Sequence, residues 1–123
     1  MNMTIDMIKV KATSALRDSY RSIISDIVFE ETKKKDALVI LLGTNKKSAD
    51  RCVKDLSPSV SKIMTKGYGE NLVGIQFAGK RPSLIVIEAT DEKIIDSDYF
   101  KKGVIPCLRN GGRIIIVFYG EIQ

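Results

Sequence analysis

The sequence predicts an α/β fold with three layers, in which a mostly parallel sheet of about five strands is covered by helices on both faces. Two observations support this prediction. Apolar runs of strand length, at residues 37–42 and 113–119, are typical of parallel strands buried on both faces. Segments with the 3.6-residue period of amphipathic helices lie between such runs, and this alternation of strands and helices is the pattern of an α/β domain.

The length and composition indicate one soluble domain over residues 1–123. With 123 residues, 44% of them hydrophobic and 28% charged, the chain is long enough for one core of ordinary size. No apolar run approaches the roughly 20 residues of a membrane-spanning helix, and the first residues lack the pattern of a secretory signal. We therefore expect a cytoplasmic protein with no membrane partner.

The first half of the chain predicts two strands and two or three helices. Residues 7–12 alternate between apolar and charged side chains, as expected of a half-exposed edge strand. A strongly amphipathic helix begins near Ser14, and after a polar break at residues 33–36 the buried strand 37–42 follows. Ala49 and Cys52 mark the inner side of the next helix, and Ser57 with Pro58 predicts the start of a second short helix that ends at Gly67.

The second half predicts three more strands and one broken helix. Residues 72–77 and 84–88 have strand patterns, and the short turn between them makes them either antiparallel neighbours or parallel strands joined by an unusual loop. Residues 91–108 are helical with a break at Asp96 and Ser97, and Pro106 should bend the last turn. Residues 113–119 complete the sheet.

The residue types present exclude several kinds of catalytic site. The chain contains no histidine, so Ser-His-Asp and Cys-His mechanisms and the usual zinc sites are excluded, and we predict no metal site. Cys52 and Cys107 each fall on the apolar side of a predicted helix, where free cysteine behaves as a small hydrophobic residue. No residue receives a catalytic role from the sequence.

Two loops are candidates for a ligand site, because open α/β sheets bind ligands at the carboxyl ends of their strands. Gly43, Thr44 and Asn45 follow the first buried strand, and their amides could receive an anion at the start of the next helix. Glu88 ends the strand 84–88 and Thr90 follows it, which places a carboxylate at the same end. The alternatives are a plain strand-to-helix turn at the first loop and a helix cap at the second.

Four segments support a resemblance to a known family. Residues 105–116, with the glycine pair at 111 and 112, resemble the region before the fifth strand of class I S-adenosylmethionine-dependent methyltransferases. Residues 83–88 look like that family's preceding strand, residues 41–45 are similar to its glycine-rich first loop, and residues 72–77 are similar to its second strand. The resemblance implies a Rossmann-like fold, with S-adenosylmethionine held near Gly43, Thr44, Asn45, Glu88 and Thr90.

The chain departs from the family pattern at two positions. Asn45 stands where the family has its second loop glycine, and Gln76 stands where an acidic residue would bind the cofactor ribose. We therefore expect a non-catalytic or degenerate relative that acts as a binding or assembly module. A small enzyme that binds S-adenosylmethionine or a nucleotide is the alternative.

The charge distribution raises a third interpretation, a basic nucleic-acid-binding protein. The net charge is +5, and residues 33–66 contain nine Lys or Arg against three acidic residues. Lys47, Arg51 and Lys54 share the exposed side of one predicted helix, where they could contact phosphates or simply form a solvated face. The very apolar final strand also suggests a homodimer, provided that this strand lies at an edge of the sheet.

Overall fold

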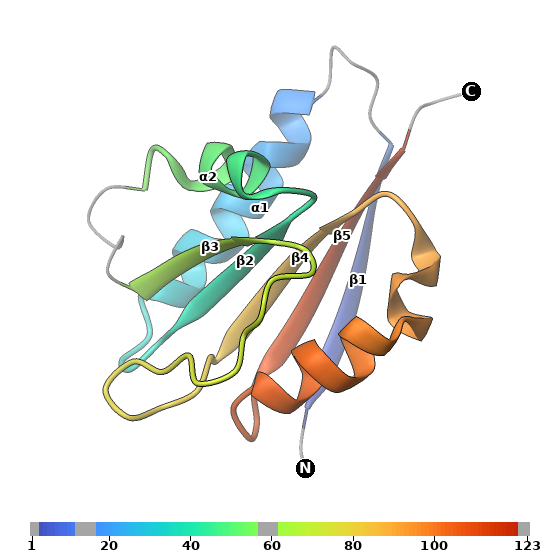
Figure 1. The fold of residues 1–123 in the computed structure, drawn as a ribbon. Helices are drawn as coiled ribbons and strands as arrows, with labels where there is room; N and C mark the ends of the chain where they lie inside the picture. The colour runs from blue at the N-terminus through green and yellow to red at the C-terminus, as the bar shows by residue number, and fades with distance from the viewer. Residues whose placement is uncertain (1–2, 12–16, 57–61, 121–123) are drawn as a thin grey trace.

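The computed structural model describes residues 3–11, 17–56 and 62–120 (Figure 1). It confirms the predicted class, because five strands form one all-parallel sheet with helical layers on both faces, consistent with a single Rossmann-like domain. The elements are β1 (Thr4–Lys11), α1 (Arg17–Thr32), β2 (Val39–Gly43), α2 (Lys46–Val53), β3 (Ile63–Gly67), β4 (Leu84–Ala89), the 3₁₀ helix η3 (Glu92–Asp96), the π-helix η4 (Tyr99–Val104), the 3₁₀ helix η5 (Ile105–Cys107) and β5 (Arg113–Gly120).

The strand order is β1-β5-β4-β2-β3. Helices α1 and α2 pack together over one face of the sheet, and the segment from η3 to η5 covers the other face (Figure 1). The chain therefore leaves β2 toward one face and leaves its neighbour β4 toward the opposite face. The two connections diverge at the carboxyl ends of adjacent strands, which makes this a topological switch point.

Both faces of the central strands are buried, and this explains the continuous apolar runs. In β4, Leu84 and Val86 belong to the cluster under α1 and α2, whereas Ile85 and Ile87 belong to the cluster under the η3 to η5 segment. The same alternation holds in β2 and β5, since successive side chains of a strand point to opposite faces.

The predicted position of the third strand is wrong. The structure places it at Ile63–Gly67, where the sequence pattern favoured the end of a short helix, and it pairs in parallel with β2. Pairing with β2 stabilises this short segment as an edge strand, which is a tertiary effect that its own pattern does not reveal. Residues 57–61, including the predicted helix start at Ser57 and Pro58, lie outside the described residues.

Residues 72–77, predicted as a strand, belong instead to the loop between β3 and β4. Leu72 is buried, but Val73 next to it is 78% exposed, and Gly74 has a positive φ of 84°. An isolated antiparallel bridge joins Phe77 to Lys80. Neither the antiparallel nor the parallel pairing expected for residues 72–77 and 84–88 therefore forms.

The other predicted elements correspond to observed ones. β1 lies at an edge of the sheet, and the helical region after β4 is interrupted at Ser97, whose Oγ accepts a hydrogen bond from the Phe100 amide at 3.2 Å. β5, however, lies between β1 and β4 and is paired on both sides. The condition for a homodimer through the final strand is therefore not met. The predicted helix start near Ser14 lies outside the described residues.

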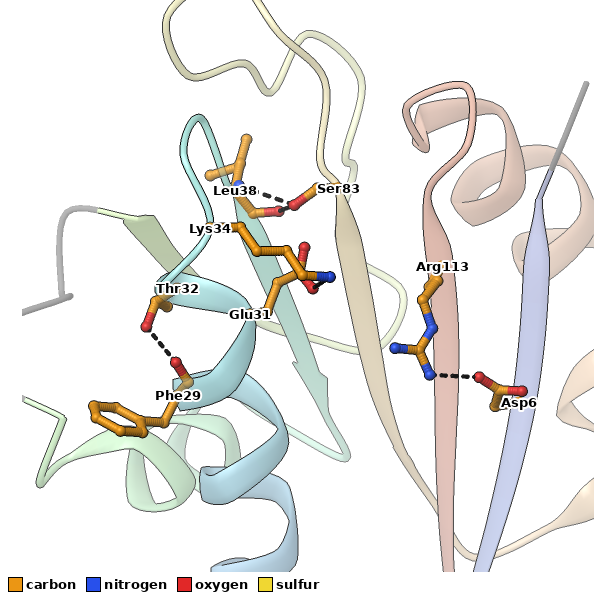
Figure 2. Close-up of polar contacts among 8 residues, drawn as sticks. All are labelled: Asp6, Phe29, Glu31, Thr32, Lys34, Leu38, Ser83 and Arg113. Atoms are coloured by element: carbon orange, nitrogen blue, oxygen red, sulfur yellow. Dashed lines mark hydrogen bonds and ion pairs between the residues drawn. The ribbon is translucent and has the colours of Figure 1, made fainter.

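Short polar contacts connect the elements at the amino end of the sheet (Figure 2). Ser83 Oγ accepts a hydrogen bond from the Leu38 amide at 3.1 Å and donates to the Leu38 carbonyl at 3.2 Å, which joins the starts of β2 and β4. Arg113 at the start of β5 pairs with Asp6 of β1 at 2.7 Å. These contacts fix the strands relative to one another far from the switch point.

The double-glycine turn before β5 also lies at the amino end. Gly111 adopts a φ of 80°, and an added Cβ at Gly112 would lie 2.9 Å from the Arg109 carbonyl oxygen. The Arg109 guanidinium donates to the carbonyls of Arg81 and Asp36 at 3.0 and 2.8 Å. This turn is therefore part of the scaffold. No helix within the described ranges is long and apolar enough to cross a membrane.

Candidate functional site

The two predicted site loops meet at the switch point between β2 and β4. Gly43 is the last residue of β2, and Glu88 is the penultimate residue of β4. The Thr44 amide donates a hydrogen bond to Glu88 Oε1 at 2.9 Å, so the loops are directly connected. Ligands of open α/β sheets bind at this place in the fold.

The loop after β2 is a tight strand-to-helix turn. An added Cβ at Gly43 would lie 2.6 Å from the Asn45 carbonyl oxygen and 2.7 Å from the Ala49 amide nitrogen, so only glycine fits without a backbone shift. Asn45 caps α2, because its side-chain oxygen accepts from the Ser48 amide at 2.9 Å. Both residues therefore have a structural role in starting α2 directly after β2.

Glu88 is the central polar residue of this site. Its side chain points toward the α1 and α2 face, and the residue is only 2% exposed. The carboxylate accepts hydrogen bonds from Thr44 N, from Ser48 Oγ at 2.8 Å and from the Tyr20 hydroxyl. We call these four residues the Glu88 cluster. It joins β4, the β2 loop, α2 and α1.

The buried environment of Glu88 shifts the pKa of its carboxyl group. Burial raises the pKa of the carboxyl group, and the hydrogen bond from the Thr44 amide opposes this effect in part. The carboxylate engages the Thr44 amide and the Ser48 hydroxyl, two donors close to the start of α2. The protein's own side chain therefore occupies the Thr44 amide, one of the three amides that the sequence suggested for an anion.

Cys52 lies next to this cluster, with its Sγ 4.0 Å from Glu88 Oε2. Burial raises the pKa of the thiol to about 11, although the Arg21 charge acts in the opposite direction. Since the thiolate is the reactive form, Cys52 is protonated and unreactive at neutral pH.

An open hollow of about 400 Å³ lies beside Glu88 on the side of η3. We call it the switch-point hollow. Thr44, Tyr68, Ala89, Thr90 and Ile94 line it, and Tyr68 is held by a 3.0 Å hydrogen bond to Ser97. Its volume lies within the range of small-ligand pockets.

The carboxylates that follow Thr90 make local contacts. Asp91 caps η3 by accepting from the Lys93 amide at 2.9 Å, and Glu92 pairs with Lys9 of β1. These contacts correspond to the structural alternative that the sequence offered for this loop. Neither carboxylate is held toward a partner that would prepare it for proton transfer.

The five predicted site residues have different positions. Gly43, Thr44 and Glu88 come together, Asn45 is engaged as the cap of α2, and Thr90 lies at the exposed rim of the switch-point hollow. Sequence reasoning missed Tyr20, Ser48 and Tyr68. The sequence could have indicated Ser48, because a hydroxyl in the first turn of a helix after a candidate loop faces the same end of the sheet. It could not have indicated Tyr20 or Tyr68, because they reach the site only through tertiary packing.

The predicted nucleic-acid-binding residues Lys47, Arg51 and Lys54 are all exposed, at or just after α2. A groove of about 600 Å³ between α1 and α2 is lined by Arg21, Arg51 and Lys54, and a hollow of about 240 Å³ is lined by Arg21, Lys47 and Arg51. The two spaces share Arg21 and Arg51, and we call them together the cationic groove. Among the described lining residues, Asp55 carries a carboxylate.

An aromatic pair lies at the inner end of the cationic groove. Tyr119 at the end of β5 stacks on Tyr20 of α1, with 4.3 Å between ring centroids. Tyr20 and Ser48 line the groove and also donate to Glu88. The Glu88 cluster therefore supports the floor of the groove.

The comparisons with known proteins identify no relative, because no family model, no curated protein and no solved structure matches this chain. Within residues 3–11, 17–56 and 62–120, no group of three or more potential metal ligands lies close enough together to hold an ion. The fold and the chemistry of the site are therefore the basis for any function.

Proposed function

We propose that this chain is a non-catalytic binding domain on a methyltransferase-like, Rossmann-type scaffold. The observation that carries the proposal is the Glu88 cluster. In an enzyme of this class the loop after the first buried strand must accept the cofactor, whereas here Thr44 N and Ser48 Oγ both donate to the buried Glu88 carboxylate. A ligand anion would have to displace that carboxylate and leave it unpaired, which is costly in a buried position.

The chemistry of the surrounding residues supports the same proposal. Cys52 is held as a thiol, Asp91 caps η3, and Glu92 is paired with Lys9. The chain has no histidine to act as a general base at neutral pH. Self-association through the final strand is not part of the proposal, because β5 is paired on both sides.

A second candidate is a small enzyme or binding protein for S-adenosylmethionine or a nucleotide, and the switch-point hollow favours it. Its lining exposes more apolar than polar surface and includes the ring of Tyr68, which suits an adenine-type ligand. Under this alternative the ligand would occupy the η3 side of Glu88 without entering the Glu88 cluster.

Thermal denaturation with added ligands distinguishes the two candidates. A ligand at one hundred times its Kd stabilises a protein by about 2.7 kcal/mol, which is a readily measured rise in Tm. We expect no rise with S-adenosylmethionine, ATP or adenosine up to millimolar concentration. A rise that depends on concentration, and that Thr90→Trp abolishes by filling the switch-point hollow, would contradict the proposal; Asp96→Trp, exposed and outside the lining, is the matched control.

A further inference from the structure

We propose that the cationic groove binds single-stranded nucleic acid, with phosphates at Lys47, Arg51 and Lys54 and a base stacked near Tyr119. The groove is separate from the switch-point hollow, so this inference does not depend on whether a small ligand binds there. It names a class of partner for a domain in which the Glu88 carboxylate already occupies the loop after β2.

The first argument is the arrangement of charge. Lys47, Arg51 and Lys54 are spaced by four and three residues, so they share one face of α2 and form a row along it. Arg21 of α1 faces the row across the groove. Lysines and arginines arranged along a groove are the electrostatic footprint of a phosphate backbone.

The second argument is the aromatic floor. Charge alone would suit any polyanion, but Tyr119 lies in the same hollow as Lys47 and Arg51, half-buried and backed by Tyr20. The Tyr20 hydroxyl is held by Glu88, so the stacked pair is fixed before a ligand arrives. Proteins that bind single strands combine a cationic path with aromatic rings on which bases stack.

The third argument is shape. The groove between α1 and α2 holds about 600 Å³, and the hollow of about 240 Å³ shares Arg21 and Arg51 with it. Spaces of this size admit unpaired nucleotides, whereas the bases of a duplex are stacked inside and cannot reach Tyr119. Polar side chains at Ser22, Ser25 and Asn45 line the same path and can hydrogen-bond to bases or sugars.

Fluorescence anisotropy with labelled oligodeoxythymidine at 50 to 200 mM salt tests the proposal. Three to four phosphate contacts predict a slope of log K against log salt of roughly −2 to −3, at about 0.7 per phosphate. We expect Lys47→Gln with Lys54→Gln to reduce the slope by about 1.4. Lys101→Gln with Lys102→Gln is the matched control, because it removes the same charge from exposed positions in η4 on the opposite face.

The aromatic contact has its own test. Tyr119→Leu should weaken binding by roughly fivefold or more at every salt concentration without changing the slope, and Tyr119→Phe should retain affinity because it keeps the ring. The double lysine variants lie on exposed positions and test the groove even if Tyr119→Leu fails to fold.

Four results would overturn the proposal. They are no binding at 50 mM salt, an equal loss of slope in the two double lysine variants, equal affinity for duplex and single strand, and equal binding of vesicles containing anionic lipid. Each would show that the cationic groove does not recognise a single strand.

Discussion

In this parallel sheet the chain enters each strand at the amino end and leaves it at the carboxyl end, and the polar contacts at these two ends differ. At the amino end, short backbone and ion-pair contacts such as Ser83 with Leu38 and Arg113 with Asp6 join neighbouring elements (Figure 2). At the carboxyl end, the connections after β2 and β4 turn to opposite faces, and the buried Glu88 carboxylate holds the opening together. Divergence of the chain at the carboxyl end creates space for a site, whereas the contacts at the amino end join neighbouring strands of the scaffold.

The two ends also differ in the energy of their polar contacts. The side chains of Arg113 and Asp6 are 46% and 42% exposed, and pairs of this kind contribute at most about 1 kcal/mol. Glu88 and Tyr20 are both buried, so the Tyr20 hydroxyl has no access to water in place of the carboxylate. Stability should therefore depend more on the carboxyl end, although that end carries the switch-point hollow.

The largest effect is expected from Glu88→Ala. It leaves Thr44 N, Ser48 Oγ and the Tyr20 hydroxyl without their acceptor and opens a cavity, which we expect to cost about 3 to 4 kcal/mol of unfolding free energy. Ser83→Ala removes the comparable link at the amino end and should cost about 1 kcal/mol. Urea denaturation followed by circular dichroism measures both.

Glu88→Gln is the control for shape, because it keeps the size and one acceptor oxygen. We expect its loss of unfolding free energy to fall between the losses for Glu88→Ala and Ser83→Ala. If Glu88→Ala proved no more destabilising than Ser83→Ala, the carboxylate would not hold the carboxyl end together.

Two tightly packed glycines, one at each end of the sheet, test the comparison with losses of unfolding free energy of intermediate size. Gly43→Ala would place its Cβ 2.6 and 2.7 Å from backbone atoms of Asn45 and Ala49, so the β2 to α2 turn must shift, at a cost of about 2 to 3 kcal/mol. Gly112→Ala at the amino end meets the Leu108 side chain at 2.8 Å as well as the Arg109 carbonyl, and part of that contact can relax. We expect about 1 to 2 kcal/mol there, measured as shifts in the urea midpoint at constant m.

If Gly112→Ala proved more destabilising than Gly43→Ala, the result would contradict the comparison. Gly111→Ala serves as a reference for conformational strain alone, because its φ of 80° is unfavourable while an added Cβ would meet nothing within 4 Å. We expect Gly111→Ala to lose about 1 to 2 kcal/mol of unfolding free energy, which measures backbone strain without a close contact.

The sequence predicted the central strands better than the edge strand β3. The strands 37–42, 84–88 and 113–119 are apolar on both faces, and that pattern is readable because both faces are covered in the structure. The third strand, Ile63–Gly67, is half-buried for most of its length and depends on pairing with β2, so its residues carry no decisive pattern. At residues 72–77 the opposite happened, because an apolar run that predicts a strand lies in a loop.

The same distinction applies to the candidate site. Gly43, Thr44 and Glu88 were accessible to sequence reasoning because they end or directly follow recognisable strands. Tyr20 and Tyr119 were not, because they are separated along the chain and meet only when α1 packs on the sheet beside β5. Residues 37–66 around Lys47 contain no aromatic residue, and the fold brings the rings of Tyr20 and Tyr119 to Lys47.

The smallest effect is expected from pH, which should act in opposite directions at the two ends. Burial raises the pKa of Glu88 above the ordinary value of 4.5, so the folded state holds its proton more tightly than the unfolded chain does. Stability from this group is therefore present at low pH and is lost as pH rises from about 4.5 through the raised pKa. At the amino end, the hydrogen bond and charge of Lys80 lower the pKa of Asp36 below 3.8, so its contribution is lost as pH falls through and below that value.

Urea denaturation at pH values from 3 to 8 separates the two contributions. The unfolding free energy of the wild type minus that of Glu88→Gln should decrease as pH rises above 4.5, and the wild type minus Asp36→Asn should decrease as pH falls below 3.8. The second change should be small, because the ion pair with Lys80 is largely exposed and screened by salt. A Glu88 difference that stayed constant or grew with pH would mean that the carboxylate is ionised in the folded state at little cost. The three donors of the Glu88 cluster would then offset the cost of burying the charge.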